Sequence, residues 1–71
     1  MRAGEFIRRT QMLGVVRGIP ARFDATCGKG SHGTLYNGDR FTVVKDGRKE
    51  CGPRLLAKML ADLGLSRRDL R

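Results

Sequence analysis

The sequence has 71 residues, of which 39% are hydrophobic and 31% are charged. This length and composition predict one folded domain spanning residues 1–71 and exclude a disordered chain as the default reading. Hydrophobic runs of membrane-spanning or signal-peptide length are absent, so we expect a soluble cytoplasmic protein with no membrane partner. Fifteen Lys and Arg against seven Asp and Glu give a net charge of +8. This balance favours a polyanionic partner, nucleic acid before an acidic protein, over the alternative of a merely soluble basic surface.

One histidine and two cysteines are the obvious candidates for metal ligands. Cys27, His32 and Cys51 are separated by 5 and 19 residues, which fits no structural zinc pattern. We therefore expect no metal and no other cofactor. Without a secretory signal the two thiols are expected to stay reduced, with packing as their predicted role.

The first third of the chain predicts a helix over residues 4–17. The predicted inner face consists of Phe6, Thr10 and Leu13, which follow one another at helical spacing. Gly14 costs roughly 1 kcal/mol of helix stability relative to alanine, so a close packing contact is predicted at this residue. The glycine that follows the helix is placed to cap its C-terminal end.

Three strands are predicted after this helix. Residues 21–26 alternate apolar and polar side chains, as a half-buried strand does. Residues 34–36 and 40–44 flank an Asn-Gly pair, which is a strong hairpin signal between two β-prone runs.

The position of the hairpin turn sets which side chains lie opposite one another. A turn centred on Asn37-Gly38 places Tyr36 opposite Asp39. Counting back along the hairpin then brings Lys45 near residues 31–32. A second lysine is therefore expected close to the histidine.

The clearest amphipathic pattern starts after Gly52-Pro53 and ends at Gly64, with proline in the first turn of the predicted helix. Its apolar face consists of Leu55, Leu56, Met59, Leu60 and Leu63. Residues 66–69 have capping-box-like spacing and predict a last short helical turn.

The predicted order is thus α-β-β-β-α, an α+β fold in which two helices cover one face of a three-stranded antiparallel sheet. The predicted core consists of Phe6, Leu13, Phe23, Leu35, Phe41, Val43, Leu56, Met59, Leu60 and Leu63.

The glycine-rich loop at residues 28–33 carries the strongest local signal for a functional site. Its glycines let another molecule approach the backbone closely, because no Cβ stands in the way. His32 is the only histidine of the chain, and its ordinary pKa near 6.5 suits proton transfer at neutral pH. Together with Lys29, these features indicate a site for a phosphate-bearing partner.

Two segments carry a resemblance to a known family. The run GKGSHG at residues 28–33 resembles the lysine-glycine-serine-histidine signature of HicA toxins, the small ribonuclease members of HicA–HicB toxin–antitoxin pairs. The run GPRLLAKML at residues 52–60, followed by LGL at 63–65, is similar to the last helix of that family. The resemblance covers about residues 5–70. The chain departs from it at Gly33, where many members carry a second histidine, and in a longer segment between the first helix and the loop.

The resemblance implies a fold like that of double-stranded-RNA-binding domains. It also implies cleavage of messenger RNA that arrests translation, and neutralisation by a HicB-type antitoxin that covers the active surface. His32 takes the position of the family's catalytic histidine. The expected function is therefore a metal-independent endoribonuclease, the toxin of a type II toxin–antitoxin pair.

Such an enzyme uses the nucleophile that RNA carries, the 2′-hydroxyl, and needs no metal if protein cations supply the charge. His32 is the predicted general base, or the general acid if the geometry is reversed. Lys29 and Lys45 would steady the phosphate, assisted by the backbone N–H groups of Gly30 and Ser31. Since the chain has one histidine, the second proton must come from another group or from water.

Each of these residues also has a plainer reading. The histidine could bond its own backbone, and the two lysines could be solvated charges at strand ends. Tyr36 could donate the second proton, stack on a base, or simply pack in the hairpin. Arg54 and Lys58 are predicted to touch phosphate or an acidic partner, with a solvated helix face as the alternative.

Two other functions compete with the toxin. One is a non-catalytic RNA-binding module of the same fold, which would hold A-form RNA in a salt-sensitive way and survive the loss of His32. The other is a small DNA-binding protein, which no helix-turn-helix spacing or extended basic helix supports. If the toxin reading holds, an acidic antitoxin is expected to cover the basic sheet and loop region and to bury His32.

Overall fold

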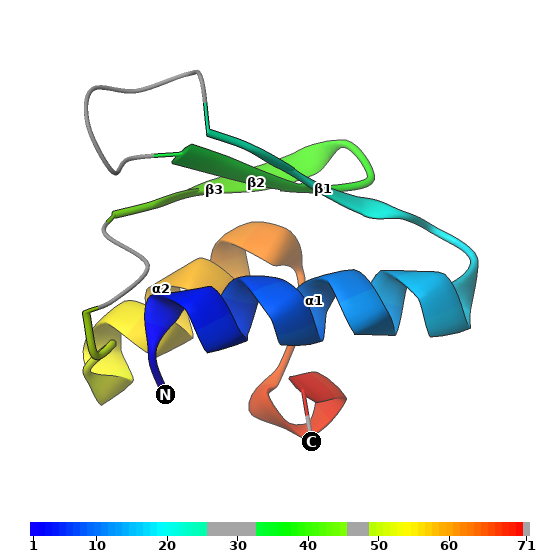
Figure 1. Ribbon diagram of the computed structural model, residues 1–71. Coiled ribbons are helices and arrows are strands. Elements are labelled where there is room, and N and C mark those ends of the chain that lie inside the picture. Colours follow the sequence, from blue (N-terminus) through cyan, green and yellow to red (C-terminus); the bar gives the residue numbers. More distant parts are fainter. Residues whose placement is uncertain (26–32, 46–48, 71) are drawn as a thin grey trace.

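Figure 1 shows the computed structural model, which describes residues 1–25, 33–45 and 49–70. In chain order the elements of these ranges are α1 (Ala3–Arg17), β1 (Ala21–Asp24), β2 (Gly33–Asn37), β3 (Arg40–Val44), α2 (Pro53–Leu63) and the short 3₁₀ helix η1 (Arg67–Leu70). The strands pair antiparallel in the order β1-β2-β3. Both helices lie on one side of the sheet, α1 against β1 and α2 against β3 (Figure 1). The predicted α+β class and element order are confirmed.

The first helix, α1, begins one residue before the predicted start and ends at the predicted residue. Its buried residues are Ala3, Phe6, Thr10 and Gly14. The buried hydroxyl of Thr10 donates a hydrogen bond of 2.8 Å to the Phe6 carbonyl, so this polar side chain is satisfied inside the core. Gly18 adopts the left-handed conformation, with φ of 75°, and caps the helix as predicted.

The predicted close contact at Gly14 is confirmed. A Cβ built on Gly14 would lie 2.6 Å from the carbonyl oxygen of Ile19 and 2.8 Å from the backbone nitrogen of Ala21. The chain therefore turns back directly over the helix, and β1 starts four residues after α1 ends. The absence of a side chain at this residue makes that tight return possible.

The second helix, α2, starts at Pro53 and ends before Gly64, as predicted. At its end the N–H of Leu65 donates to the Leu60 carbonyl at 2.8 Å, and the N–H of Gly64 donates to Ala61. These two bonds form a Schellman cap. The buried stripe is narrower than predicted, because Leu55 is 45% exposed. The first strand is also shorter than predicted, since it ends at Asp24.

The hairpin turn lies one residue later than predicted. Asn37 pairs with Arg40, so the two turn residues are Gly38 and Asp39. A type I′ turn on Asn37-Gly38 needs a positive φ at both residues, whereas only Gly38, with φ of 65°, has one here. Tyr36 consequently faces Phe41 and not Asp39. The expected approach of Lys45 to residues 31–32 lies outside the described residues.

The side chains of β3 face opposite to the prediction. Phe41 and Val43, which were assigned to the core, are 58% and 52% exposed, whereas Thr42 and Val44 are buried. The reason is the pairing of β3 with β2, because Leu35 faces the helices and its direct partner Thr42 must share that face. The Thr42 hydroxyl donates to the Asp62 carboxylate at 2.9 Å, which offsets the cost of burying it.

The core lies between the sheet and the two helices. Its buried hydrophobic residues are Ala3, Phe6, Leu35, Val44, Cys51, Met59, Leu60, Leu63 and Leu70. Three other residues of the predicted core, Leu13, Phe23 and Leu56, are partly buried and pack against it. Burial raises the pKa of the Cys51 thiol, in agreement with the packing role predicted for it. Cys27 lies outside the described residues.

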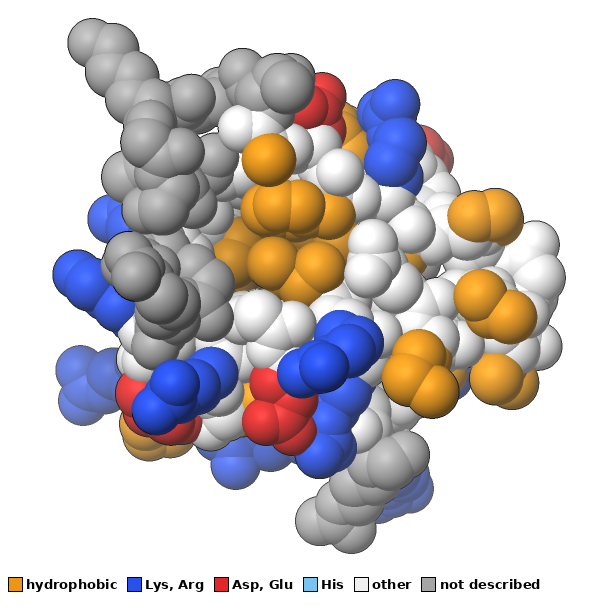
Figure 2. Space-filling model, viewed as in Figure 1, with side chains coloured by type: hydrophobic (Ala, Val, Ile, Leu, Met, Phe, Trp, Pro, Cys, Tyr) orange, Lys and Arg blue, Asp and Glu red, His pale blue; other side chains and the backbone are white. Residues whose placement is uncertain are grey.

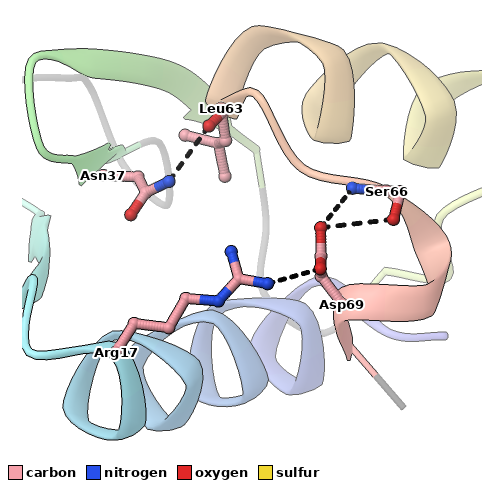
Figure 3. Close-up of polar contacts among 5 residues, drawn as sticks. All are labelled: Arg17, Asn37, Leu63, Ser66 and Asp69. Atoms are coloured by element: carbon pink, nitrogen blue, oxygen red, sulfur yellow. Dashed lines mark hydrogen bonds and ion pairs between the residues drawn. The ribbon is translucent and has the colours of Figure 1, made fainter.

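Polar contacts connect α2 and η1 to the other elements (Figure 3). The Asn37 side-chain amide donates to the Leu63 carbonyl at 3.0 Å and joins the hairpin to the end of α2. The Asp69 carboxylate accepts from the backbone N–H of Ser66 at 2.8 Å, which is one half of the predicted capping box. The same carboxylate pairs with Arg17 at 2.5 Å and so fastens η1 to the end of α1.

The Asp69 carboxylate makes the fold sensitive to acid. The backbone N–H of Ser66 and then the Arg17 guanidinium hold the pKa of Asp69 below its ordinary value. Because the folded-state pKa is lower than the unfolded-state pKa, this group stabilises the fold at neutral pH, and the contribution is lost as pH falls through the folded value. We expect Asp69→Asn to lower the melting temperature at pH 7 and to flatten its decline below about pH 4.

Melting curves from pH 7 to pH 2 would check this prediction. Asp39→Asn, which removes the same charge from the exposed turn, serves as the control for net charge. An Asp69→Asn protein with the parent's melting temperature at pH 7 and the parent's acid slope would contradict the assigned role.

Candidate nucleic-acid interface

Four of the predicted site residues, Lys29, Gly30, Ser31 and His32, lie outside the described residues. The loop's last glycine, Gly33, is described and starts β2 as a buried residue. A Cβ built on Gly33 would lie 2.8 Å from Cε1 of Phe23, closer still to Cζ, and 3.0 Å from the Asp24 carbonyl oxygen. The Phe23 ring therefore fills the space that a side chain at residue 33 would need. This contact gives a packing reason for glycine at residue 33.

Two aromatic side chains and one arginine form a row on the outer face of the sheet. Tyr36 is paired with Arg22 of β1 on one side and with Phe41 of β3 on the other. The Arg22 guanidinium carbon lies 4.7 Å from the centre of the Tyr36 ring. The Tyr36 and Phe41 rings are tilted by 46°, with their centres 6.2 Å apart. We call these three residues the stacking row.

The stacking row is open because both helices cover the opposite face of the sheet (Figure 1). Arg22 is exposed and Phe41 is 58% exposed, whereas Tyr36 is half-buried between them. Thr34 and Val43 lie beside the row on the same face, since they form the cross-strand pair two positions further along. The exposed Lys45 follows β3 directly, at the end of the sheet where β2 begins.

A groove between β3 and α2 gathers three lysines. It has a volume of about 420 Å³, and Lys45, Lys49 and Lys58 all line it. Val43, Leu55 and Met59 supply its apolar lining, and Glu50 supplies one carboxylate. We call it the lysine groove. The structure therefore brings together two predicted phosphate-binding residues, Lys45 and Lys58, that are 13 positions apart in the sequence.

One lysine of the groove forms an ion pair with a neighbouring carboxylate. Lys58 pairs with the Asp62 carboxylate at 3.0 Å, and this bond is the main cause that lowers the pKa of Asp62. Asp62 therefore stays ionised well into the acid range and offsets part of the Lys58 charge. Arg54 is exposed in the first turn of α2 but does not line the groove.

A second exposed apolar surface lies on the helical layer. It consists of Met12, Val15, Val16 and Ile19, which are 65%, 79%, 84% and 55% exposed. Figure 2 shows hydrophobic side chains at the end of the molecule where α1 ends. Met12, Val15 and Val16 belong to α1 and so lie across the sheet from the stacking row. They provide control positions for experiments on the outer face.

The described residues include side chains of the kinds that proteins use to contact nucleic acids. Aromatic rings and a guanidinium suit stacking with bases, and the lysine ammonium groups suit phosphates. Proton transfer at neutral pH would rest on His32, the only histidine of the chain. In the described ranges no group of three or more His, Cys, Asp or Glu side chains is placed to hold a metal ion. Nor is any helix of these ranges long and apolar enough to cross a membrane.

Arg22, Phe41 and Lys49 are not among the site residues predicted from the sequence. Hydrophobicity alone assigns Phe41 to the core. The hairpin could have indicated the face of Phe41, because direct partners in an antiparallel pair share a face. Both the predicted and the observed turn place Leu35 opposite an even-numbered residue of β3. With Leu35 on the inner face, Phe41 must therefore lie on the outer face.

No family model, no curated protein and no solved structure matches this chain.

Proposed function

We propose that this chain is a metal-independent endoribonuclease, the toxin of a toxin–antitoxin pair, in which His32 moves the proton. The observation that carries the proposal is the cationic end of the sheet. Val44 pairs with Gly33, the residue after His32, and Lys45 follows Val44. A net charge of +8 and the lysine groove around Lys45 support a phosphate-bearing substrate.

The fold class supports the same proposal. The α-β-β-β-α order, with both helices on one face of the sheet, is what the resemblance to HicA toxins and to double-stranded-RNA-binding domains leads us to expect. A fold alone does not define a function, so the proposal rests on the site residues and on the motif around His32.

The proposed reaction uses the 2′-hydroxyl of the RNA. His32 accepts the proton of that hydroxyl as its oxygen bonds to phosphorus. Lys45 stabilises the negative charge that builds on the phosphoryl oxygens. The bond from phosphorus to the 5′-oxygen then breaks, and that oxygen takes a proton from water or a second acid. The products are a 2′,3′-cyclic phosphate and a free 5′-hydroxyl.

The proposed partner is an acidic, HicB-type antitoxin. It would cover the basic outer face and the segment that carries His32, and thereby exclude RNA. A structure of such a complex that leaves His32 open to solvent would overturn this mode of inhibition.

The test compares the parent protein with His32→Ala on RNA in the presence of EDTA. We expect cleavage by the parent and a loss of rate by a factor of about 10² to 10⁴ in the variant, the usual contribution of a general acid or base. The 3′ ends should carry a cyclic phosphate or its 3′-phosphate product. Equal melting temperatures would show that the variant is folded.

The other outcomes decide against the nuclease. If both proteins bind RNA equally, in a salt-sensitive way, and neither cuts it, the chain is an RNA-binding module and His32 is a loop residue. Equal cutting by both proteins would exclude His32 as the group that moves the proton.

A further inference from the structure

We propose that the outer face of the sheet binds unpaired RNA, by stacking bases on Phe41 and on the Arg22–Tyr36 pair. This inference deepens the proposed function, on which it rests, because it names single-stranded RNA as the form of the substrate. It departs from the duplex binding that a double-stranded-RNA-binding fold would suggest.

The exposure of the aromatic residues is the first step. Phe41 and Val43 are 58% and 52% exposed and share the outer face of the sheet with Tyr36. Contiguous exposed apolar surface on a small, highly charged protein marks a place where another molecule binds. The row is continuous across all three strands, since its members are direct cross-strand partners.

The chemistry of the row selects a nucleic acid over an apolar protein surface. The Arg22 guanidinium lies over the Tyr36 ring, with its carbon 4.7 Å from the ring centre, so this pair offers a base a planar cation backed by an aromatic ring. Base–aromatic stacking and nearby cations are the combination that proteins use for single strands. Asp24, at the end of β1, is half-buried and has an interaction partner of its own.

The geometry selects unpaired bases. The faces of bases inside a duplex are covered by their neighbours, and A-form RNA is read through its backbone and 2′-hydroxyls. The Tyr36 and Phe41 ring centres are 6.2 Å apart, nearly twice the roughly 3.4 Å between successive stacked bases of a strand. Two neighbouring bases can therefore stack on Phe41 and on the Arg22–Tyr36 pair only in an RNA strand that is extended and unstacked.

The residues along and after β3 indicate a path for the bound RNA. Phe41 and Val43 alternate along β3 and the exposed Lys45 follows it, so RNA that extends from Phe41 along β3 passes Val43 and reaches an ammonium group. Lys45 lies at the end of the sheet where β2 begins. Stacking at Phe41 would thus deliver a phosphate to the cationic end on which the proposed cleavage depends.

The experiment measures RNA binding to the full chain with His32→Ala, so that cleavage does not interfere. Fluorescence anisotropy at fixed salt would compare an unstructured 12-nucleotide RNA with the duplex of the same sequence. We expect Phe41→Ala to weaken binding of the single strand by about 5- to 150-fold and to leave duplex binding unchanged. Phe41→Tyr, which keeps a ring, should retain most of the affinity.

Val16→Ala is the matched control, because it removes an exposed apolar side chain from the helical layer. It should change neither affinity. Unchanged single-strand affinity in Phe41→Ala would overturn the inference. An equal loss for both RNAs would also overturn it, since stacking on unpaired bases would then not be the cause. Binding of an acidic protein but no single-stranded RNA by the parent would assign the face to a protein partner.

The inference and the proposed function fail in different ways. Cleavage that depends on His32 but not on Phe41 would leave the nuclease standing and remove the stacking row. RNA binding that depends on Phe41, without any cleavage that depends on His32, would support the stacking row and exclude the nuclease.

Discussion

Replacing Gly14 by alanine is expected to destabilise the protein by about 2 kcal/mol, although helix propensity alone predicts a gain of about 1 kcal/mol. The new Cβ would lie 2.6 Å from the Ile19 carbonyl oxygen and 2.8 Å from the Ala21 nitrogen. Both atoms belong to the backbone and cannot rotate away, so the segment that leads into β1 must move off α1. Urea unfolding followed by circular dichroism would measure the change.

Val15→Ala is the matched control for this prediction. It lies next to Gly14 in the same helix but is 79% exposed, so only helix propensity should act there. We expect a change of no more than about 0.5 kcal/mol, toward greater stability. A Gly14→Ala protein more stable than the parent would show that the helix and β1 are not in the close contact described.

Replacing Gly33 by alanine is expected to cost about 3 kcal/mol. The Cβ would run into the edge of the Phe23 ring and come within 3.0 Å of the Asp24 carbonyl oxygen. Overpacking of this kind forces the ring from its rotamer or the two strands apart. The free energy of unfolding from urea titration is again the measurement.

A double-mutant cycle separates the effect of the Phe23 ring on the Gly33→Ala protein from the effect of the neighbouring backbone. Phe23→Leu removes the atoms nearest to the new Cβ, so Gly33→Ala should cost at least about 1 kcal/mol less in that background. Gly52→Ser controls for loss of a glycine, because nothing lies within 4 Å of a Cβ at that residue and serine is a good N-cap. Additive effects of the two changes would exclude the Phe23 ring as the obstacle.

Helix ends were predictable from the sequence because single residues determine them locally. Gly18 and Gly64 adopt positive φ and end the two helices, and Pro53 starts the second. The close contact at Gly14 was predictable too, since a glycine in the middle of a helix is costly without such a reason.

The face of β3 was not predictable from hydrophobicity, because both faces of Arg40–Val44 carry apolar residues. Phe41 and Val43 look more apolar than Thr42 and Val44, yet the second pair is buried. Two tertiary features decide the outcome, the pairing of Thr42 with Leu35 and the hydrogen bond from Thr42 to Asp62 on α2.

The candidate site was predictable only in part for the same kind of reason. Tyr36 and Lys45 were singled out, but the stacking row became visible only with the cross-strand register. The lysine groove depends on how α2 docks against β3, and no local pattern encodes that arrangement. The reading of His32 rests on its motif, since this residue lies outside the described ranges.

Contacts between α1 and η1 set when the described fold can be completed during synthesis. Arg9 donates to the Leu70 carbonyl at 3.0 Å, Arg17 pairs with Asp69, and Leu70 completes the core under α1. The backbone N–H of Ala3 also donates a hydrogen bond to the Lys49 carbonyl at 3.0 Å. The part of α1 that contacts η1 therefore stays uncovered in a nascent chain until residue 70 has left the ribosome. The contact between α1 and η1 is therefore the last part of the described fold that can form during synthesis.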